Sequence, residues 1–273
     1  MHILPIRLLL HSRDPLNVTV PMLRGRWGEV LKLLDEEVYT EIFRPESSAS
    51  SVPLYVLRPA PPNPQFAPAI ECLLLGSATR HLSIVLRAWD IAGGRGVGNP
   101  PVWFVIRRAC GVSPEGALLD APSAWSLDEA RWPLFGDPQS TPCQLTFPAP
   151  LRLVRKNWET GRDELIRQPQ LVHLIDAALR RFQMFGIFVS HEERQALLGA
   201  ADQIPQHSLG WSMQNLAVIS PGLRRKPDRR GVVGGLALPE GAGPLWRLLA
   251  QVQWLHLGKS TVHGLGQLCI DAL

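Results

Sequence analysis

Near its end the chain reads Gly258-Lys259-Ser260-Thr261-Val262-His263-Gly264-Leu265-Gly266-Gln267-Leu268, between a helical run and an apolar, strand-like tail. Its three glycines call for left-handed backbone conformations or a close approach to another group. The lysine, hydroxyl and histidine side chains suit contact with a phosphate backbone. The stretch is not a nucleotide-binding P-loop, because Gln253 stands where the leading glycine belongs and the helix precedes the strand.

The same arrangement occurs earlier in the chain. Trp89 to Gly93 is followed by Gly96-Val97-Gly98 and a strand, just as Trp254 to Gly258 is followed by Gly264-Leu265-Gly266 and a strand. This repeat indicates two units of similar topology, each with a glycine loop between its last helix and last strand. The 273 residues are enough for two domains of ordinary size. We predict domains at 1–141 and 142–273.

In the first half, apolar residues recur with alternating helix and strand periods. We predict strands at 2–12, 52–59, 69–75 and 102–106, and helices at 24–39 and 79–92. This βαββαβ order is that of a ferredoxin-like fold and of the RNA-recognition motif, although the strands lack that motif's aromatic signature. Residues 113–141 are rich in proline, glycine and aspartate and are expected to be loop and linker.

The second half repeats this order less cleanly. We predict a strand at 144–154, helices at 171–188 and 191–203, a hairpin from 216–219 and 232–238, a helix at 245–256 and a strand at 265–273. The expected fold is therefore α+β, with two tandem ferredoxin-like (RRM-like) βαββαβ domains and a C-terminal glycine-rich loop.

Composition excludes several classes of protein. With 45% hydrophobic and 19% charged residues the chain is globular, and it has no apolar run of 18 residues, so no membrane partner is expected. The apolar start is interrupted by Pro5 and Arg7, which predicts a strand rather than a signal peptide. The four cysteines form no C-x-x-C pair, which argues against structural zinc or a disulfide framework and fits a reducing cytoplasm. We expect no cofactor and no metal.

Positive charge concentrates in the second half. Residues 148–273 hold 15 basic and 10 acidic side chains, whereas residues 1–147 hold 13 and 14. Arginine far outnumbers lysine, which reflects either a GC-rich genome or a surface built for phosphates and stacked bases. The densest segment is Arg224-Arg225-Lys226-Pro227-Asp228-Arg229-Arg230. Because such a run repels itself without an anionic partner, we predict that it contacts RNA.

Four segments together carry a family pattern. They are Leu23 to Leu31, then Leu75-Gly76-Ser77-Ala78 with its helix and Gly96-Val97-Gly98, then the arginine-rich segment before Gly234-Gly235, and last Leu257 to Gly266. In this order they resemble the RAMP-superfamily endoribonucleases that process CRISPR precursor RNA. Many members place a histidine in or just after the first helix, but this chain has none from 15 to 77. In this it is similar to the divergent, histidine-poor form of type IV CRISPR systems.

The resemblance implies metal-independent cleavage of a CRISPR repeat RNA that forms a stem-loop. A ribose 2′-OH would attack the adjacent phosphate, leaving a 2′,3′-cyclic phosphate and a 5′-OH. The expected partners are this RNA, the mature guide RNA that stays bound, and other subunits of the effector complex. The alternative is a non-catalytic RAMP subunit that caps or scaffolds the guide RNA. A general single-strand RNA binder is a third reading, which the lack of aromatic residues interleaved with basic ones disfavours.

The candidate catalytic residues are Arg24, Arg26, Tyr39 and Arg44. Guanidinium groups stay protonated, so the arginines would hold the phosphate and stabilise the phosphorane rather than act as bases. Tyr39 could exchange a proton near Arg44, or it is simply a core residue at the helix end. Arg24 and Arg26 oppose the dipole of the predicted helix, which either an anion or solvent would offset.

The candidate RNA-binding residues come from the arginine-rich segment and the glycine-rich loop: Arg224, Arg225, Lys226, Arg229, Arg230, Lys259, Ser260 and His263. In the loop, Lys259 and Ser260 are expected to hold phosphates rather than to take part in bond making. His263 could also serve as an acid or base, whereas a capping or core role is expected for His256.

Overall fold

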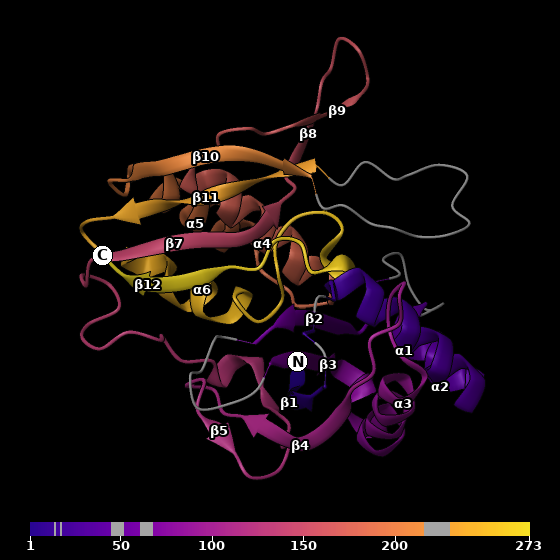
Figure 1. The fold of residues 1–273 in the computed structure, drawn as a ribbon. Helices are drawn as coiled ribbons and strands as arrows, with labels where there is room; N and C mark the ends of the chain where they lie inside the picture. The colour runs from indigo at the N-terminus through magenta and orange to yellow at the C-terminus, as the bar shows by residue number, and fades with distance from the viewer. Residues whose placement is uncertain (14, 17, 45–51, 61–67, 216–229) are drawn as a thin grey trace. The chain divides into compact units, whose positions relative to one another are not determined.

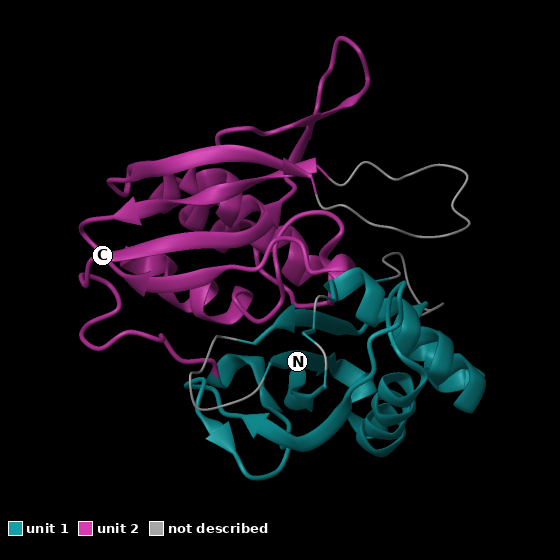
Figure 2. Cartoon of the chain, viewed as in Figure 1, with its two compact units in different colours: residues 1–129 teal, residues 130–273 magenta. Residues whose placement is uncertain are grey.

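The computed structural model describes residues 1–13, 15–16, 18–44, 52–60, 68–215 and 230–273. The chain divides into two compact units, Met1–Glu129 and Ala130–Leu273 (Figure 2). The predicted boundary at residue 141 falls later along the chain than the division between these units. The predicted domain ranges, 1–141 and 142–273, therefore stay a prediction.

Unit 1 is built on one antiparallel sheet, with α1, α2 and α3 together on one side (Figure 1). The sheet has the strand order β2-β3-β1-β4-β5, and β6 pairs with β1. Its elements, with two 3-10 helices, are β1 (His2–His11), α1 (Val20–Leu34), α2 (Glu36–Phe43), β2 (Tyr55–Pro59), β3 (Ala69–Leu75), η1 (Gly76–His81), α3 (Leu82–Arg95), β4 (Val105–Val112), β5 (Leu118–Leu119), β6 (Trp125–Ser126) and η2 (Leu127–Glu129).

Aromatic side chains fill the space between the sheet and the helices of unit 1. Trp27 of α1 stacks on Trp89 of α3 with ring centroids 5.1 Å apart and an interplanar angle of 8°. Tyr55 of β2 meets Trp27 edge-on at 5.2 Å, and all three side chains are buried. Because such aromatic pairs add to the stabilisation from burial alone, these contacts fix how α1 lies against the sheet.

A buried ion cluster crosses three strands of the same sheet. Arg7 of β1 and Arg58 of β2 both donate to the carboxylate of Glu71 on β3, with Nε–oxygen distances of 2.9 and 2.6 Å. Burial alone would raise the pKa of Glu71, but the two guanidinium groups outweigh it and hold that pKa below its usual value. Loss of either arginine would leave buried charge uncompensated.

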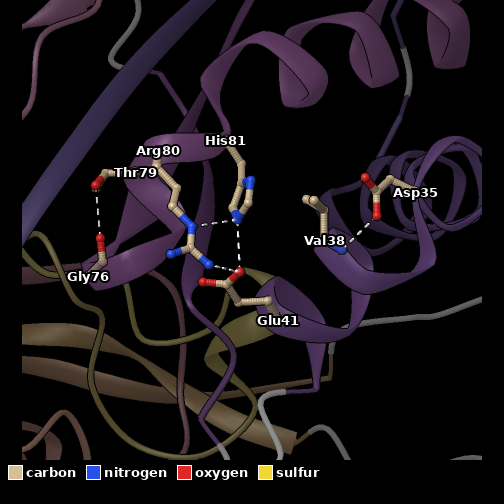
Figure 3. Close-up of polar contacts among 7 residues, drawn as sticks. All are labelled: Asp35, Val38, Glu41, Gly76, Thr79, Arg80 and His81. Carbon is tan, nitrogen blue, oxygen red and sulfur yellow. Dashed lines mark hydrogen bonds and ion pairs between the residues drawn. The ribbon is translucent and has the colours of Figure 1, made fainter.

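The predicted helix 24–39 is wrong, because the chain forms two helices that meet at Asp35. Asp35 is extended, with φ −161° and ψ 107°, and its carboxylate accepts the backbone N–H of Val38 at 2.9 Å (Figure 3). An aspartate at the N-cap with glutamates in the first turn is a favourable helix start. The apolar periodicity continues across this break and hides it.

Three other predictions for unit 1 need correction. The strand predicted at 102–106 corresponds to β4, which begins at Val105 and ends at Val112. The prediction ended too early because Arg107 and Arg108 interrupt the apolar pattern of the strand. The stretch 113–141, predicted as loop and linker, contains the short strands β5 and β6. Helix α3 extends to Arg95, so the first glycines of the predicted loop are helical. There, a Cβ on Gly93 would lie 2.3 Å from the carbonyl oxygen of Phe104, which explains the glycine by packing.

Unit 2 repeats the topology. Its four-stranded antiparallel sheet has the order β10-β11-β7-β12, which matches β2-β3-β1-β4 strand for strand. In Figure 1, α4, α5 and α6 lie behind this sheet, and a separate two-stranded hairpin, β8–β9, projects from it. The elements are β7 (Cys143–Leu151), β8 (Val154–Lys156), β9 (Asp163–Leu165), α4 (Leu171–Met184), α5 (His191–Gln203), β10 (His207–Asn215), β11 (Arg230–Leu238), η3 (Gly243–Leu245), α6 (Trp246–Val252), η4 (Thr261–His263) and β12 (Cys269–Ala272).

The predicted hairpin partner in unit 2 is wrong. β11 pairs with β10, whose residues 207–215 were not predicted as a strand, while the predicted strand 216–219 lies outside the described residues. Polar and exposed residues dominate β10, because it is an edge strand, and they conceal its period. Helix α6 ends at Val252 rather than at His256, which leaves a longer connection before the glycine-rich loop.

The two units therefore confirm the predicted fold class, an α+β chain of two tandem ferredoxin-like units. No described helix combines the length and apolar character that a membrane span requires.

A pair of glycines in α1 offers a matched test of the packing in unit 1. A Cβ at Gly28 would lie 2.8 Å from Cε1 of Phe43, whereas a Cβ at Gly25 meets nothing within 4 Å. We expect Gly25→Ala to raise the free energy of unfolding by about 0.5–1 kcal/mol through helix propensity. Gly28→Ala should lower it by about 1–3 kcal/mol through overpacking. Urea denaturation of both variants measures this, and shifts of the same sign would contradict the packing described.

Candidate functional site

Arg24 is held by two aromatic side chains near the start of α1. Its Nε donates a hydrogen bond to the hydroxyl of Tyr55 at 2.5 Å, and its Cζ lies 5.3 Å from the centroid of the Phe43 ring. Burial raises the pKa of Tyr55 to about 12 although Arg24 opposes this, so the hydroxyl stays protonated at neutral pH. Among the described residues, the terminal Nη groups of Arg24 have no hydrogen-bond partner. The guanidinium is thus held in place through Nε, and its two Nη groups are available to bind an anion.

Phe43 joins this arrangement to Tyr39 and Arg44. Tyr39 stacks on Phe43 with centroids 4.8 Å apart, and Phe43 contacts Tyr55 at 4.6 Å. Arg44 follows Phe43 in the chain, caps α2 through a backbone hydrogen bond and is exposed. Two of the four predicted catalytic residues, Arg24 of α1 and Tyr39 of α2, therefore contact the same aromatic ring, and Arg44 follows that ring in the chain.

Arg26, the fourth predicted catalytic residue, has structural partners. Its Nε donates to the carbonyl oxygen of Gly96 at 2.8 Å, and its Nη1 pairs with Glu29 at 2.8 Å. The first contact joins α1 to the C-cap of α3, and the second lies within α1. Arg26 is therefore less available than Arg24 to a bound anion, and its catalytic role stays a prediction.

A polar cluster that sequence reasoning missed lies between α2 and η1 (Figure 3). One oxygen of Glu41 lies 2.8 Å from Nε2 of His81 and 2.7 Å from Nη2 of Arg80. Burial raises the pKa of Glu41, but hydrogen bonds from Ser77, His81 and Arg80 together outweigh it and lower that pKa to about 2. The sequence did carry a signal, because Ser77 belongs to a segment of the family pattern and His81 follows it closely.

In unit 2 the glycine-rich loop is packed against its own supports. Gly266 has φ 72°, and a Cβ there would lie 1.8 Å from the carbonyl oxygen of Leu257, so only glycine fits. Buried Arg181 of α4 donates to the carbonyl oxygen of Leu255 just before the loop. Burial lowers the pKa of Arg181 to about 10, which leaves it charged at neutral pH. His256 is buried with Nδ1 3.1 Å from the carbonyl oxygen of Leu265, as expected for a core residue.

Of the predicted RNA-binding residues of this loop, Lys259 contacts the β8–β9 hairpin. Lys259 is exposed; its Nζ pairs with Asp163 of β9 at 2.5 Å, and its backbone N–H donates to Arg152. Ser260 adopts φ 65°, a strained conformation for a residue with a side chain, and it is the N-cap of η4, which ends at His263. Such strain is often found at functional sites.

Of the basic segment, only Arg230 is described. It is exposed at the start of β11, and its carbonyl oxygen accepts a hydrogen bond from Nη1 of Arg152 at 3.0 Å. Arg224, Arg225, Lys226 and Arg229 lie outside the described residues. Through Arg152, the first residue of β11 is thus connected to the backbone of the glycine-rich loop.

Comparison with solved structures defines the class of this fold. Thermus thermophilus Cas6 aligns with a TM-score of 0.60 at 16% identity, over 98% of both chains. A Cas6 product complex gives 0.64 at 17% identity, also over 98% of both chains. A RAMP protein described as binding different RNA substrates gives 0.55 at 9% identity, over 99% of both chains. At these identities the similarity concerns the fold, which is that of Cas6 and RAMP proteins.

Sequence comparison supports the same conclusion for unit 2. The family model described as "CRISPR-associated endoribonuclease Cas6" matches residues 145–268, from β7 through the glycine-rich loop. Comparison with curated protein sequences found no match. The resemblance to RAMP-type CRISPR processing endoribonucleases is thereby confirmed, while the assignment to type IV systems stays a prediction.

The Glu41 cluster should make stability depend on acid. Because the folded pKa is about 2 against an ordinary 4.5, the stabilisation is complete above pH 4.5 and is lost as the pH falls toward 2. We expect Glu41→Gln to lower Tm at pH 7 and to flatten the decline of Tm in this window. Asp90→Asn, at an exposed position within α3, is the control. An acid profile of Glu41→Gln that parallels that of the wild type would contradict this role.

Proposed function

We propose that this protein is an endoribonuclease that binds CRISPR repeat RNA and cuts precursor transcripts into guide RNAs. The observation that carries the proposal is the fixed Arg24 guanidinium, held at Nε by Tyr55 with its outer nitrogens available. A cation presented in this way suits a phosphodiester that gains negative charge as it reacts. The Cas6 match over residues 145–268 and the RAMP fold support RNA as the substrate.

The proposed reaction needs no group from outside the protein and the RNA. The ribose 2′-oxygen forms a bond to phosphorus, the bond from phosphorus to the 5′-oxygen breaks, and the 2′ proton leaves as the 5′-oxygen gains one. The products are a 2′,3′-cyclic phosphate and a 5′-OH. Arg24 and Arg44 stabilise the charged intermediate, because guanidinium groups hold phosphate oxygens well. Tyr39, which stacks on Phe43, is the side chain proposed to exchange a proton.

Binding falls mainly to unit 2 in this proposal. Lys259 and Ser260 of the glycine-rich loop and His263 hold the RNA backbone, together with Arg230 and the basic residues that precede it. The surplus of basic residues in 148–273 supports this division. We further propose that the enzyme stays on its product as a subunit of a cytoplasmic effector complex.

The decisive experiment incubates the protein with repeat RNA in excess EDTA. A cut at one position is expected, and it should vanish when the nucleotide before the cut carries a 2′-deoxyribose. Binding without cutting would favour the alternative, a non-catalytic subunit that caps or scaffolds the guide RNA. Cleavage that survives the 2′-deoxy substitution would exclude the proposed reaction.

Variants should separate the cutting residues from the binding residues. Arg24→Ala is expected to slow single-turnover cleavage by about 100-fold, the usual effect of losing one donor to developing charge, with little change in Kd. Exposed Arg87→Ala on α3 is the control. Changing Arg224 and Arg225 together should weaken binding and reduce the slope of log affinity against log salt by about 1.4–1.8. Equal effects of both changes on rate and affinity would refute this division.

A further inference from the structure

The β8–β9 hairpin presents a tryptophan to solvent. Trp158 lies in the turn between the two strands and is 89% exposed. In Figure 1 the hairpin stands clear of the four-stranded sheet of unit 2. Removing a large aromatic ring from water lowers the free energy. An exposed tryptophan at the tip of a projecting hairpin is therefore typical of a contact site.

The turn that carries Trp158 is held by a dense set of hydrogen bonds. The side-chain oxygen of Asn157 accepts the backbone N–H groups of Glu159 and Thr160 at 2.9 and 3.0 Å. The backbone of Asn157 also bonds to Gly161 and Arg162, both at 2.8 Å. These bonds fix the backbone on both sides of Trp158. The ring is therefore presented by an ordered turn, which reduces the entropy lost on binding.

Basic side chains gather around Asp163 of the hairpin. Asp163 of β9 pairs with Lys259 and lies near Arg152 and Lys156, and the hydrogen bond from Lys259 is the largest of the effects that lower its pKa. Within residues 154–165 three basic side chains balance three carboxylates, so the local excess of positive charge comes from Arg152 and Lys259 beside the hairpin. Lys156 is exposed and lies directly before the turn, as the cross-strand partner of Asp163.

We propose that the β8–β9 hairpin is an RNA-contacting arm, in which Trp158 stacks on an unpaired base while Lys156 and Lys259 hold the neighbouring phosphates. The inference rests on the proposed function and adds a contact to it. An exposed ring flanked by cations fits a nucleotide, which offers both a π face and a negative charge. An unpaired base is required, because a base within a duplex already has both faces covered.

The ion pair between Lys259 and Asp163 connects the arm to the glycine-rich loop. An RNA strand that crosses the loop therefore meets the hairpin next. Stacking would add affinity without demanding a particular base, because every base has a π face. The sequence shows no aromatic residues interleaved with basic ones, and Trp158 stands between Asn157 and Glu159. The proposed stacking contact was therefore not visible in the sequence pattern.

The test measures Kd for repeat RNA with and without its single-stranded flanks. We expect Trp158→Ala to weaken binding of the flanked RNA by about 5- to 150-fold, and Trp158→Phe to retain most of the affinity. With the flanks removed, the effect of Trp158→Ala should disappear. Phe188→Ala, which removes a ring that is 88% exposed elsewhere in unit 2, is the matched control and should change nothing.

Salt dependence separates stacking from charge. Trp158→Ala should leave the slope of log affinity against log salt unchanged, whereas Lys156→Ala should reduce it by about 0.7, the value for one contact with a single-stranded phosphate. If Trp158→Ala binds the flanked RNA as tightly as the wild-type protein does, while the wild-type protein binds and cuts repeat RNA, the proposed arm is overturned but the proposed function stands. Failure of the wild type to bind repeat RNA would overturn the proposed function and the arm with it.

Discussion

The aromatic cluster of unit 1 is the constraint on which the candidate site depends. Trp27 stacks on Trp89 and touches Tyr55, and Phe43 packs against both Trp27 and Tyr55. These contacts set the position of α1 against the sheet and of α2 against α1. In this arrangement the Arg24 guanidinium lies over the Phe43 ring and is hydrogen-bonded to the Tyr55 hydroxyl. The proposed chemistry thus rests on a side chain whose orientation the core determines.

The two units share a topology but use it differently. Unit 1 gathers arginine and tyrosine around a buried aromatic core, an arrangement suited to stabilising charge. Unit 2 places its distinctive features at the glycine-rich loop, the β8–β9 hairpin and the first residue of β11, where exposed cations are close together. Buried Arg181 serves this surface indirectly, because its hydrogen bond to Leu255 anchors the segment that enters the loop. The proposed division between cutting and binding follows from these differences.

Much of the fold could be predicted because strand and helix periods are visible in the sequence and the glycine loop recurs in each half. The predictions that failed did so for physical reasons. The break at Asp35 was hidden because apolar spacing continues across it, and β10 was missed because an edge strand carries few apolar residues. In the candidate site, Arg24 was predicted from its place at the start of the expected helix 24–39, and its catalytic role stays a prediction. Tyr55 and Phe43 were not predicted as part of the site. Tyr55 lies in a strand and Phe43 at the end of a helix, and nothing in the sequence near either residue indicates that their side chains meet. Trp158 was missed because only the fold shows how exposed it is.

The central claim is that Tyr55 orients Arg24 to stabilise the negative charge that develops on the phosphodiester when the ribose 2′-oxygen attacks it. The most direct measurement is the single-turnover cleavage rate of Tyr55→Phe at saturating protein, with Kd and Tm measured alongside. Removing the hydroxyl takes away the partner of Nε but keeps the ring in the core. We predict a rate lowered about tenfold or more with Kd unchanged, because the lost orientation acts on the transition state alone. A wild-type rate, or a loss confined to Kd, would contradict the claim.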